Sequence, residues 1–310
     1  MIEAVLWVMA IVIGLVLLVV SGDMLSDKIV EVARKAGIST LVISIVLISL
    51  ATTLPELITS AVASYQGLTG MALGNALGSI FANIALILGL AALARPLKAT
   101  RAAYENSLIM LMSFFLVMLL SADGVLSRFD GIILLGSYVI YLKWLIKKHA
   151  RDENGGSVRG DATLLDYAIL LFLGLILVTG AKMVVYGGEN IAEAMGISDF
   201  VIGATIVAIG TSLPEMTNAM YGAVRGRGSI SVGNIIGADI MNALVVLGIA
   251  SVIRPLQTGA SALTVALVLA VMLPMTASLR RTHGLGRPIG IYFLAVYFLY
   301  LVLMFSGMKL

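Results

Sequence analysis

Long apolar stretches follow one another along almost the whole chain, and short polar segments separate them. Each stretch is long enough for a helix that crosses a membrane, which needs roughly 20 residues. The pattern predicts ten spans, at residues 4–22, 38–64, 70–94, 105–122, 131–146, 164–182, 198–222, 231–253, 261–279 and 288–306. The first stretch follows only Glu3 and no basic residue, which favours a membrane helix over a cleaved signal peptide.

The longest polar connection divides the spans into two groups of five. We expect residues 1–146 and 164–310 to form the two halves, with 147–163 as a linker. The predicted fold class is an all-α membrane protein with ten transmembrane helices.

Composition supports a membrane protein and narrows its chemistry. Of the 310 residues, 60% are hydrophobic and 12% are charged, whereas a soluble domain carries roughly 25% charged residues. The chain has no cysteine, so disulfides and thiolate metal sites are excluded. His149 and His283 both lie in basic connecting segments, which argues against a zinc site. We expect neither a cofactor nor a nucleic-acid partner.

The basic residues predict the orientation. If the N-terminus lies outside and ten spans alternate, sixteen of the twenty Lys and Arg residues fall on the cytoplasmic side. Cytoplasmic loops of membrane proteins carry such an excess. The pattern therefore predicts a cell-membrane protein with both termini outside and a cytoplasmic linker. It also predicts a solvated cytoplasmic turn that contains Asp23, Asp27, Lys28, Glu31 and Lys35.

The two halves repeat each other in sequence. "GISTLVISIVLISLATTLPE" begins at Gly37 and "GISDFVIGATIVAIGTSLPE" begins at Gly196, an offset of 159. Between residues 37 and 97, 20 of 61 ungapped pairs are identical, and the shared residues include Gly, Asn, Pro, Glu and Arg. Because each half has an odd number of spans, the second half should enter the membrane from the opposite side. In transporters built in this way, the substrate site lies at the midplane, where broken helices meet.

The repeated "TLPE" and "SLPE" motifs carry oxygen ligands inside apolar runs. Thr52 and Glu56 are four residues apart and share a helix face, with Thr53 beside them. Pro55 removes the usual hydrogen bond to the carbonyl of Ala51 and opens that turn. Hydroxyls, free carbonyls and a carboxylate suit Na⁺ or Ca²⁺ better than soft metals. The second half repeats the set as Thr211, Ser212, Pro214 and Glu215.

The next span of each half adds further polar side chains. Ser79 and Asn83 are four residues apart, as are Ala238 and Asn242. Glycines four residues apart predict close helix packing, and these are Gly74, Gly78, Gly233 and Gly237. For Asn75 and Asn234, an interhelical hydrogen bond and a role in the site remain equal alternatives.

Two facing glutamates can neutralise one Ca²⁺ or be neutralised by monovalent cations in nearby oxygen pockets. Competition for the same carboxylates would give exchange. A kink proline or a paired glutamate would be structural if it occurred once. Two copies in register favour a functional site instead.

The motifs "ATTLPE" and "GTSLPE", each followed by "GNxxG" and then Asn, resemble the two repeats of the cation/calcium antiporter superfamily. The prokaryotic Na⁺/Ca²⁺ exchangers are the most similar branch, and the resemblance covers essentially the whole chain. It implies a Ca²⁺ site on Glu56 and Glu215 with the carbonyls of Thr52 and Thr211. It implies Na⁺ sites with the side chains of Thr52, Thr53, Ser79, Thr211 and Ser212 and the carbonyls of Ser49 and Ala208. Asn83 and Asn242 would lie at the centre.

The chain departs from the family pattern in the same region. Ala51 replaces a glycine, and Thr53 replaces a serine. Ala238 stands where a site serine is common, so one hydroxyl ligand is missing, and Asp239 adds a carboxylate opposite Ile80. We include Asp239 among the candidate ligands. These changes leave the Na⁺ stoichiometry and the driving ion open.

Three other functions compete with Na⁺/Ca²⁺ exchange. A Ca²⁺/H⁺ exchanger would use Glu56, Glu215 and Asp239 to bind protons, but the retained hydroxyls favour Na⁺. An intramembrane enzyme lacks a paired-aspartate, HExxH or Ser–His motif. A passive channel fits inverted repeats less well than alternating access does. The expected partners are therefore Ca²⁺, Na⁺ and the lipid bilayer. The sequence does not predict the oligomeric state.

Overall fold

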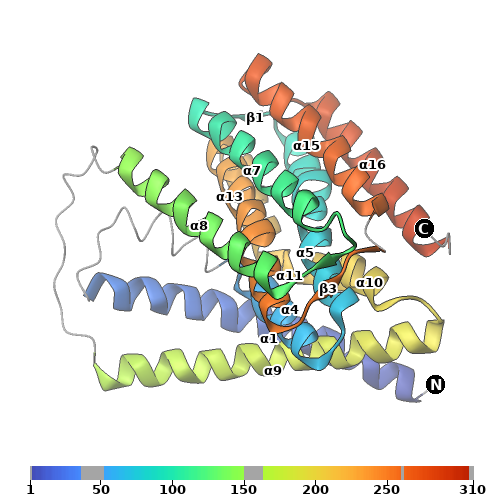
Figure 1. Cartoon of the computed structure of the whole chain (residues 1–310). Helices are drawn as coiled ribbons and strands as arrows, with labels where there is room; N and C mark the ends of the chain where they lie inside the picture. Colours follow the sequence, from blue (N-terminus) through green and yellow to red (C-terminus); the bar gives the residue numbers. More distant parts are fainter. Residues whose placement is uncertain (1, 36–51, 150–162, 260–261, 307–310) are drawn as a thin grey trace.

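The computed structural model describes residues 2–35, 52–149, 163–259 and 262–306, and nearly all of these are helical (Figure 1). The predicted all-α architecture is confirmed. Eight described helices are long and apolar enough to cross a membrane, and a bent pair, Asp199–Thr211 with Leu213–Val224, would make nine. The first part of span 38–64 lies outside the described residues, so the tenth span stays a prediction.

The described elements of the first half are α1 (Ile2–Lys35), α4 (Leu54–Gln66), α5 (Thr69–Ala82), the π-helical turn η2 (Asn83–Leu88), α6 (Gly89–Ala94), β1 (Leu97–Lys98), α7 (Arg101–Leu120), β2 (Val125–Leu126) and α8 (Arg128–His149).

Those of the second half are α9 (Leu164–Met195), α10 (Asp199–Ile202), η4 (Gly203–Val207), α11 (Ala208–Thr211), α12 (Leu213–Val224), α13 (Gly228–Met241), η5 (Asn242–Val246), α14 (Leu247–Ile253), β3 (Leu256–Gln257), α15 (Ala262–Thr282), β4 (Gly284–Leu285) and α16 (Arg287–Phe305). At the offset of 159, α4 corresponds to α12, α5 to α13 and α8 to α16.

The core of the molecule is formed by the segments α5–η2–α6 and α13–η5–α14. In each, 83% of the most apolar window is buried, against 22% for α1. Small residues allow α5 to pack closely against the second half, as predicted for its glycines. A Cβ atom on Gly74 would lie 2.4 Å from the carbonyl oxygen of Phe200, and one on Gly78 would lie 2.5 Å from that of Ala204. At Gly233 no described atom comes within 4 Å.

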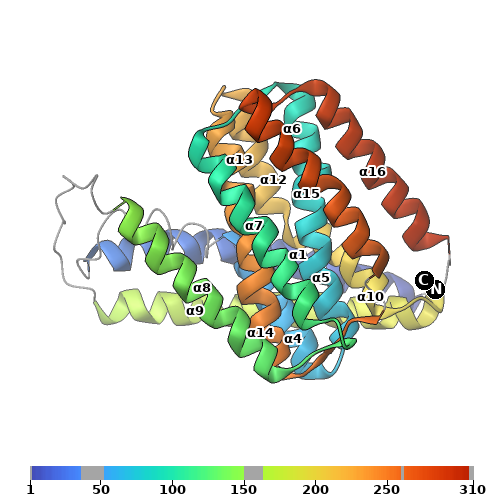
Figure 2. The ribbon, with the colours of Figure 1, turned by 45° about the horizontal axis from the view of Figure 1, so that its top comes forward.

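The two longest helices, α1 and α9, lie side by side and cross the other helices at a steep angle (Figures 1 and 2). Gly14 and Gly180 permit this contact, since a Cβ atom on Gly14 would lie 2.7 Å from the carbonyl oxygen of Gly180.

Helix α1 continues to Lys35, so the turn predicted after residue 22 is wrong. Charges at its end explain the extension. Lys28 donates to Asp166 of α9 at 2.6 Å, and Lys35 donates to Asp166 at 3.0 Å and pairs with Glu31 at 2.6 Å. The hydrogen bonds from Lys35 and Lys28 lower the pKa of Glu31. These pairs keep the polar last turns helical and join them to the start of α9.

Short strands and arginines connect the two halves reciprocally. Strand β1 pairs with β4, and β2 pairs with β3, so each sheet takes one strand from each half. Strands β1 and β3 lie near opposite ends of α7 (Figure 1). Arg128 donates to the carbonyl of Ile253, and its counterpart Arg287 donates to the carbonyl of Leu93, both at 3.3 Å. Strand pairs and arginine hydrogen bonds therefore join the two halves at both ends of α7.

Candidate ion-binding site

The broken helix predicted at the second LPE motif is confirmed. Helices Asp199–Thr211 and Leu213–Val224 meet at an angle of 49°. The break falls at Ser212 (φ −82°, ψ 11°), with Pro214 in the first turn of α12. In the first half, Pro55 has the same position in α4, after Thr53 (φ −89°, ψ 1°). Each proline therefore begins a new helix, where its missing N–H group is not needed.

Both motif glutamates are fully buried. The exposed fraction of Glu56 and of Glu215 is 0%, and Asp239 is buried to the same extent. Glu215 lies in the first turn of α12, directly after Ser212, whose hydroxyl contacts Glu56. Three carboxylates in an apolar interior are costly unless cations or protons neutralise them.

Hydrogen bonds across the two halves fix these carboxylates. The Ser212 hydroxyl donates to Oε1 of Glu56 at 2.8 Å. The Asn83 amide donates to Oδ1 of Asp239 at 2.9 Å. One partner of each pair comes from each half, so the site lies where the halves meet.

The site asparagines begin π-helical turns, which the sequence pattern did not reveal. Turn η2 starts at Asn83, and η5 starts at Asn242. A third π-helical turn, η4, directly precedes Ala208 and Thr211. Such turns often occur at functional sites, since they interrupt the regular α-helical hydrogen-bond pattern and leave backbone carbonyls available to other partners. The repeated asparagine marks where two of them begin, but an asparagine alone does not distinguish a π-helical turn from an α-helical one.

Several buried oxygens in this region have no hydrogen-bond partner among the described residues. They are Oε2 of Glu56, Oγ of Ser79, Oδ1 of Asn83, Oδ2 of Asp239 and Oδ1 of Asn242. Buried polar atoms in native proteins are almost always paired. Carboxylate, hydroxyl and amide oxygens are the ligands of hard cations, so this set is suited to a cation that enters and leaves.

Carboxylates alone do not form the site. In the part of the chain that the structure describes, no group of three or more His, Cys, Asp or Glu side chains is arranged to hold a metal ion. A bound cation would therefore need the hydroxyl, amide and carbonyl oxygens as well.

The remaining predicted ligands are distributed as follows. The Ala208 carbonyl accepts the Ser212 amide at 3.1 Å and the Thr211 hydroxyl at 3.3 Å. Thr53 is buried and Thr52 is half-buried, at the start of the described α4 region. Ser49 lies outside the described residues.

Asn75 contacts residues of both LPE regions, which the sequence pattern did not predict. Its amide nitrogen donates to the backbone carbonyl of Glu56 at 3.1 Å and to the Ser60 hydroxyl at 2.9 Å. Its amide oxygen accepts the Thr211 hydroxyl at 3.1 Å. Of the two alternatives for Asn75, the interhelical hydrogen bond is therefore present, and it ends on a candidate ligand.

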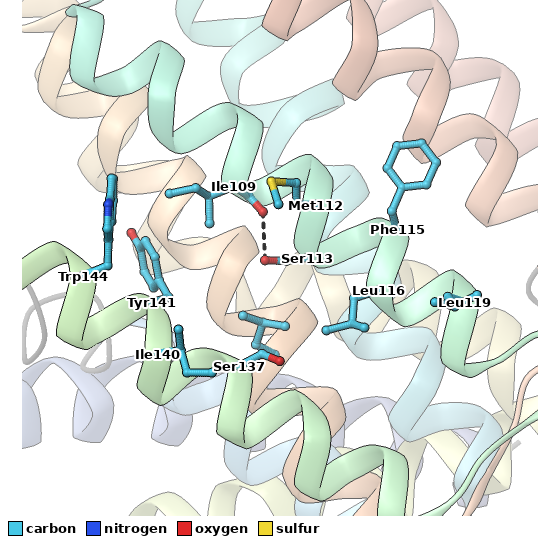
Figure 3. Close-up of a pocket in the computed structure, with 11 residues that line it drawn as sticks. Ile109, Met112, Ser113, Phe115, Leu116, Leu119, Ser137, Ile140, Tyr141 and Trp144 are labelled. Atoms are coloured by element: carbon cyan, nitrogen blue, oxygen red, sulfur yellow. Dashed lines mark hydrogen bonds between the residues drawn. The ribbon is translucent and has the colours of Figure 1, made fainter.

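A separate apolar groove lies between α7 and α8 (Figure 3). Side chains such as Leu116 and Ile140 line it, and no described lining residue is acidic. Its serines are already bonded within their helices, since Ser113 donates to the Ile109 carbonyl at 2.9 Å and Ser137 donates to the Ile133 carbonyl at 2.8 Å. The groove contains none of the predicted ligands and is not a cation site.

Known proteins resemble the chain along its whole length. An uncharacterized membrane protein of Methanocaldococcus jannaschii is 34% identical over 92% of this chain and 93% of its own. The sodium/calcium exchanger MaX1 of Methanosarcina acetivorans is 29% identical over 94% and 96% of the two chains. A structure of the sodium–calcium exchanger NCX_Mj soaked with Na⁺ and Sr²⁺ is 34% identical, covers 96% of this chain and 99% of that one, and superposes with a TM-score of 0.66.

A family model matches the chain twice, over residues 6–147 and 165–306, and its description is sodium/calcium exchanger protein. The two matches start 159 residues apart (165 minus 6), which is the offset of the repeat. They cover most of both halves, with both LPE motifs and both site asparagines inside them. The chain therefore belongs to the sodium/calcium exchanger family.

Proposed function

We propose that the protein is a secondary antiporter that exchanges Na⁺ for Ca²⁺ by alternating access. The observation that carries the proposal is the contact between Ser212 and Glu56, because it brings a hydroxyl from one LPE region onto the glutamate of the other. With Glu215 close by, this arrangement offers two charges for one Ca²⁺ and separate hydroxyls for Na⁺. The membership of the exchanger family supports the same function.

The proposed ligands follow from the residues that the site brings together. Glu56 and Glu215 would bind Ca²⁺, while Ser79, Thr211, Ser212 and the Ala208 carbonyl would bind Na⁺. Thr52, Thr53 and the Ser49 carbonyl complete the first half by the internal repeat. When Na⁺ occupies its pockets, it neutralises the glutamates and removes the attraction for Ca²⁺. The two ions would then compete, and exchange needs no covalent chemistry.

We further propose that the halves are inverted in a cell membrane, with both termini outside. The excess of Lys and Arg on one predicted side supports this orientation. The reciprocal pairing of β1 with β4 and of β2 with β3 fits two halves related by a twofold axis.

The experiment is uptake of radioactive Ca²⁺ into liposomes that contain the purified protein and are loaded with Na⁺. Dilution into Na⁺-free buffer should drive Ca²⁺ in, and equal Na⁺ on both sides should abolish the uptake. Liposomes with the Glu56→Gln variant provide the matched control. Uptake that ignores the Na⁺ gradient would refute the proposal.

A Ca²⁺/H⁺ exchanger is the second candidate, and Asp239 is the observation that favours it. This buried carboxylate is held by Asn83, and the neighbouring Ala238 lacks the hydroxyl that a Na⁺ pocket would use. An imposed pH gradient should then drive Ca²⁺ uptake without Na⁺, and Asp239→Asn should remove that component alone.

A further inference from the structure

Asn75 is a buried side chain that contacts both LPE regions and is not one of the predicted ligands. It lies on α5, and its exposed fraction is 0%. Its amide bridges the Glu56 backbone in the first half and the Thr211 side chain in the second. The first partner lies in α4 and the second at the end of α11, so each LPE region supplies one of them.

The direction of each hydrogen bond follows from elementary chemistry. A backbone carbonyl only accepts, so the end of Asn75 that faces the Glu56 carbonyl must be its NH₂ group. The amide oxygen therefore faces Thr211, and the Thr211 hydroxyl must donate its single proton in that direction. The nearby Ala208 carbonyl, at 3.3 Å, also only accepts. The O–H group of Thr211 therefore points toward these two acceptors, which share its one proton, and its lone pairs point away from them.

A hydroxyl binds a cation through a lone pair, and a proton that points at the cation would repel it. We propose that Asn75 is a positioning residue that holds the Thr211 hydroxyl as an acceptor-only ligand for Na⁺. The inference rests on the proposed Na⁺/Ca²⁺ exchange and extends it to a residue that does not touch the ion.

The second half lacks the equivalent anchor, which makes the two sides unequal. Asn75 is held by Ser60, but the counterpart of Ser60 is Ala219. In the second half, the hydroxyl between the two helices belongs to Ser231 of α13, and it donates to the carbonyl of Ala219 in α12 at 2.8 Å. In the first half, Ser60 donates to the Ala72 carbonyl at 3.3 Å.

Asn234, the counterpart of Asn75, has an amide nitrogen with no partner among the described residues. Asn75 is therefore the more firmly oriented of the two asparagines. This difference makes Asn234→Ala a matched control for Asn75→Ala.

The test measures the effect of Thr211→Val on half-saturation by Na⁺ in three backgrounds. With Asn75 present, loss of the hydroxyl should raise the Na⁺ concentration for half-maximal exchange roughly 3- to 10-fold, the range for one hydrogen-bonding group. Asn75→Asp keeps an acceptor oxygen, so the effect of Thr211→Val should persist there. In the Asn75→Ala background, it should fall below roughly 2-fold, because the two changes remove the same interaction.

Further measurements separate positioning from general damage. Asn234→Ala should leave the effect of Thr211→Val unchanged. Exchange of Ca²⁺ for Ca²⁺ without Na⁺ should keep its half-saturation within roughly 2-fold in Asn75→Ala, whereas a structural defect would change it as well. If Asn75→Ala does not fold, Asn75→Leu takes its place, because it also removes the acceptor oxygen but keeps a side chain of similar size.

An equal effect of Thr211→Val in the Asn75→Ala background would overturn the inference. A loss of the effect in the Asn75→Asp background would do the same. Failure of the proposed function looks different, because the wild-type protein would then show no dependence on Na⁺ at all.

Discussion

The Ser212 hydroxyl lies 2.8 Å from Oε1 of Glu56, although the two residues are 156 positions apart in the chain. Asn83 and Asp239 form the reciprocal pair, also 156 positions apart and 2.9 Å from atom to atom. Each half thus supplies one donor and one carboxylate to the other. A change in either half should alter the whole site, which the following experiments test.

Replacement of either glutamate by its amide should abolish Ca²⁺ exchange. Glu56→Gln and Glu215→Gln remove the charge that Ca²⁺ needs but keep the shape, so the protein should still fold. Ca²⁺ uptake in liposomes measures the loss, and gel filtration in detergent checks the fold. Wild-type rates in both variants would show that the site is assigned to the wrong residues.

The missing hydroxyl at Ala238 should limit the apparent affinity for Na⁺. Ala238 is fully buried beside Asp239, whereas its counterpart Ser79 has a hydroxyl with no partner among the described residues. Ala238→Ser should lower the Na⁺ concentration for half-maximal exchange by up to roughly 10-fold, and Ser79→Ala should raise it. Titration of Ca²⁺ uptake with Na⁺ measures both. The idea fails if neither substitution moves the Na⁺ curve.

The inverted arrangement can be tested with two positions that the repeat makes equivalent. Asp123 and Thr282 are 159 residues apart, and both are exposed, Asp123 in the turn after α7 and Thr282 at the end of α15. Because the chain has no cysteine, Asp123→Cys and Thr282→Cys each introduce a single reactive thiol. A membrane-impermeant maleimide should label the first in intact cells and the second only after lysis. Labelling of both from the same side would exclude inversion.

The charged cluster at the start of α9 should stabilise the contact with α1. Asp166 accepts from Lys28 and Lys35 and also from the Thr163 backbone at 2.8 Å, which caps α9. Asp166→Asn should lower the melting temperature by a few degrees, and high salt should reduce the difference by screening the ion pairs. Thr163→Ala is the control that weakens the cap and spares the lysines. Equal melting temperatures for Asp166→Asn and the wild type would contradict this role.

The pH dependence of the same cluster has a definite sign. Because its lysine partners lower the pKa of Glu31 in the folded state, this group contributes stability above its ordinary pKa of 4.5. That contribution is lost as the pH falls through the lowered value. The melting temperature should therefore fall on acidification, and less so in a Glu31→Gln variant.

The sequence predicted the elements that depend on local composition. Apolar length located the spans that the structure describes, and the second LPE motif located the helix break at Ser212. It did not predict that α1 continues to Lys35, because that extension depends on Asp166, more than a hundred residues away. The repeated motif pointed to Glu56 and Glu215, and the structure buries both of them. The donors that hold Glu56 and Asp239 could not be paired, because pairing requires the packing of one half on the other.

The π-helical turns show a different limit. Residues from Asn83 to Leu88 have an ordinary helical composition, and nothing in it distinguishes a π-helical turn from an α-helical one. The tertiary contacts of η4 help to explain such turns, since the Tyr300 hydroxyl donates to the Ala204 carbonyl at 2.8 Å. The Ala204 carbonyl thus accepts a hydrogen bond from a residue of α16, which lies far along the chain.

The exchange of strands between the halves also has a consequence for how the protein is made. Leu97 pairs with Leu285, so β1 can pair with β4 only after residue 285 has left the ribosome. Val125 likewise pairs with Gln257. The first half therefore enters the membrane with both of its strands unpaired, and only the last helices to be inserted can close them. In a chain truncated after the linker, both strands should remain unpaired. We therefore expect membrane quality control to degrade such a chain.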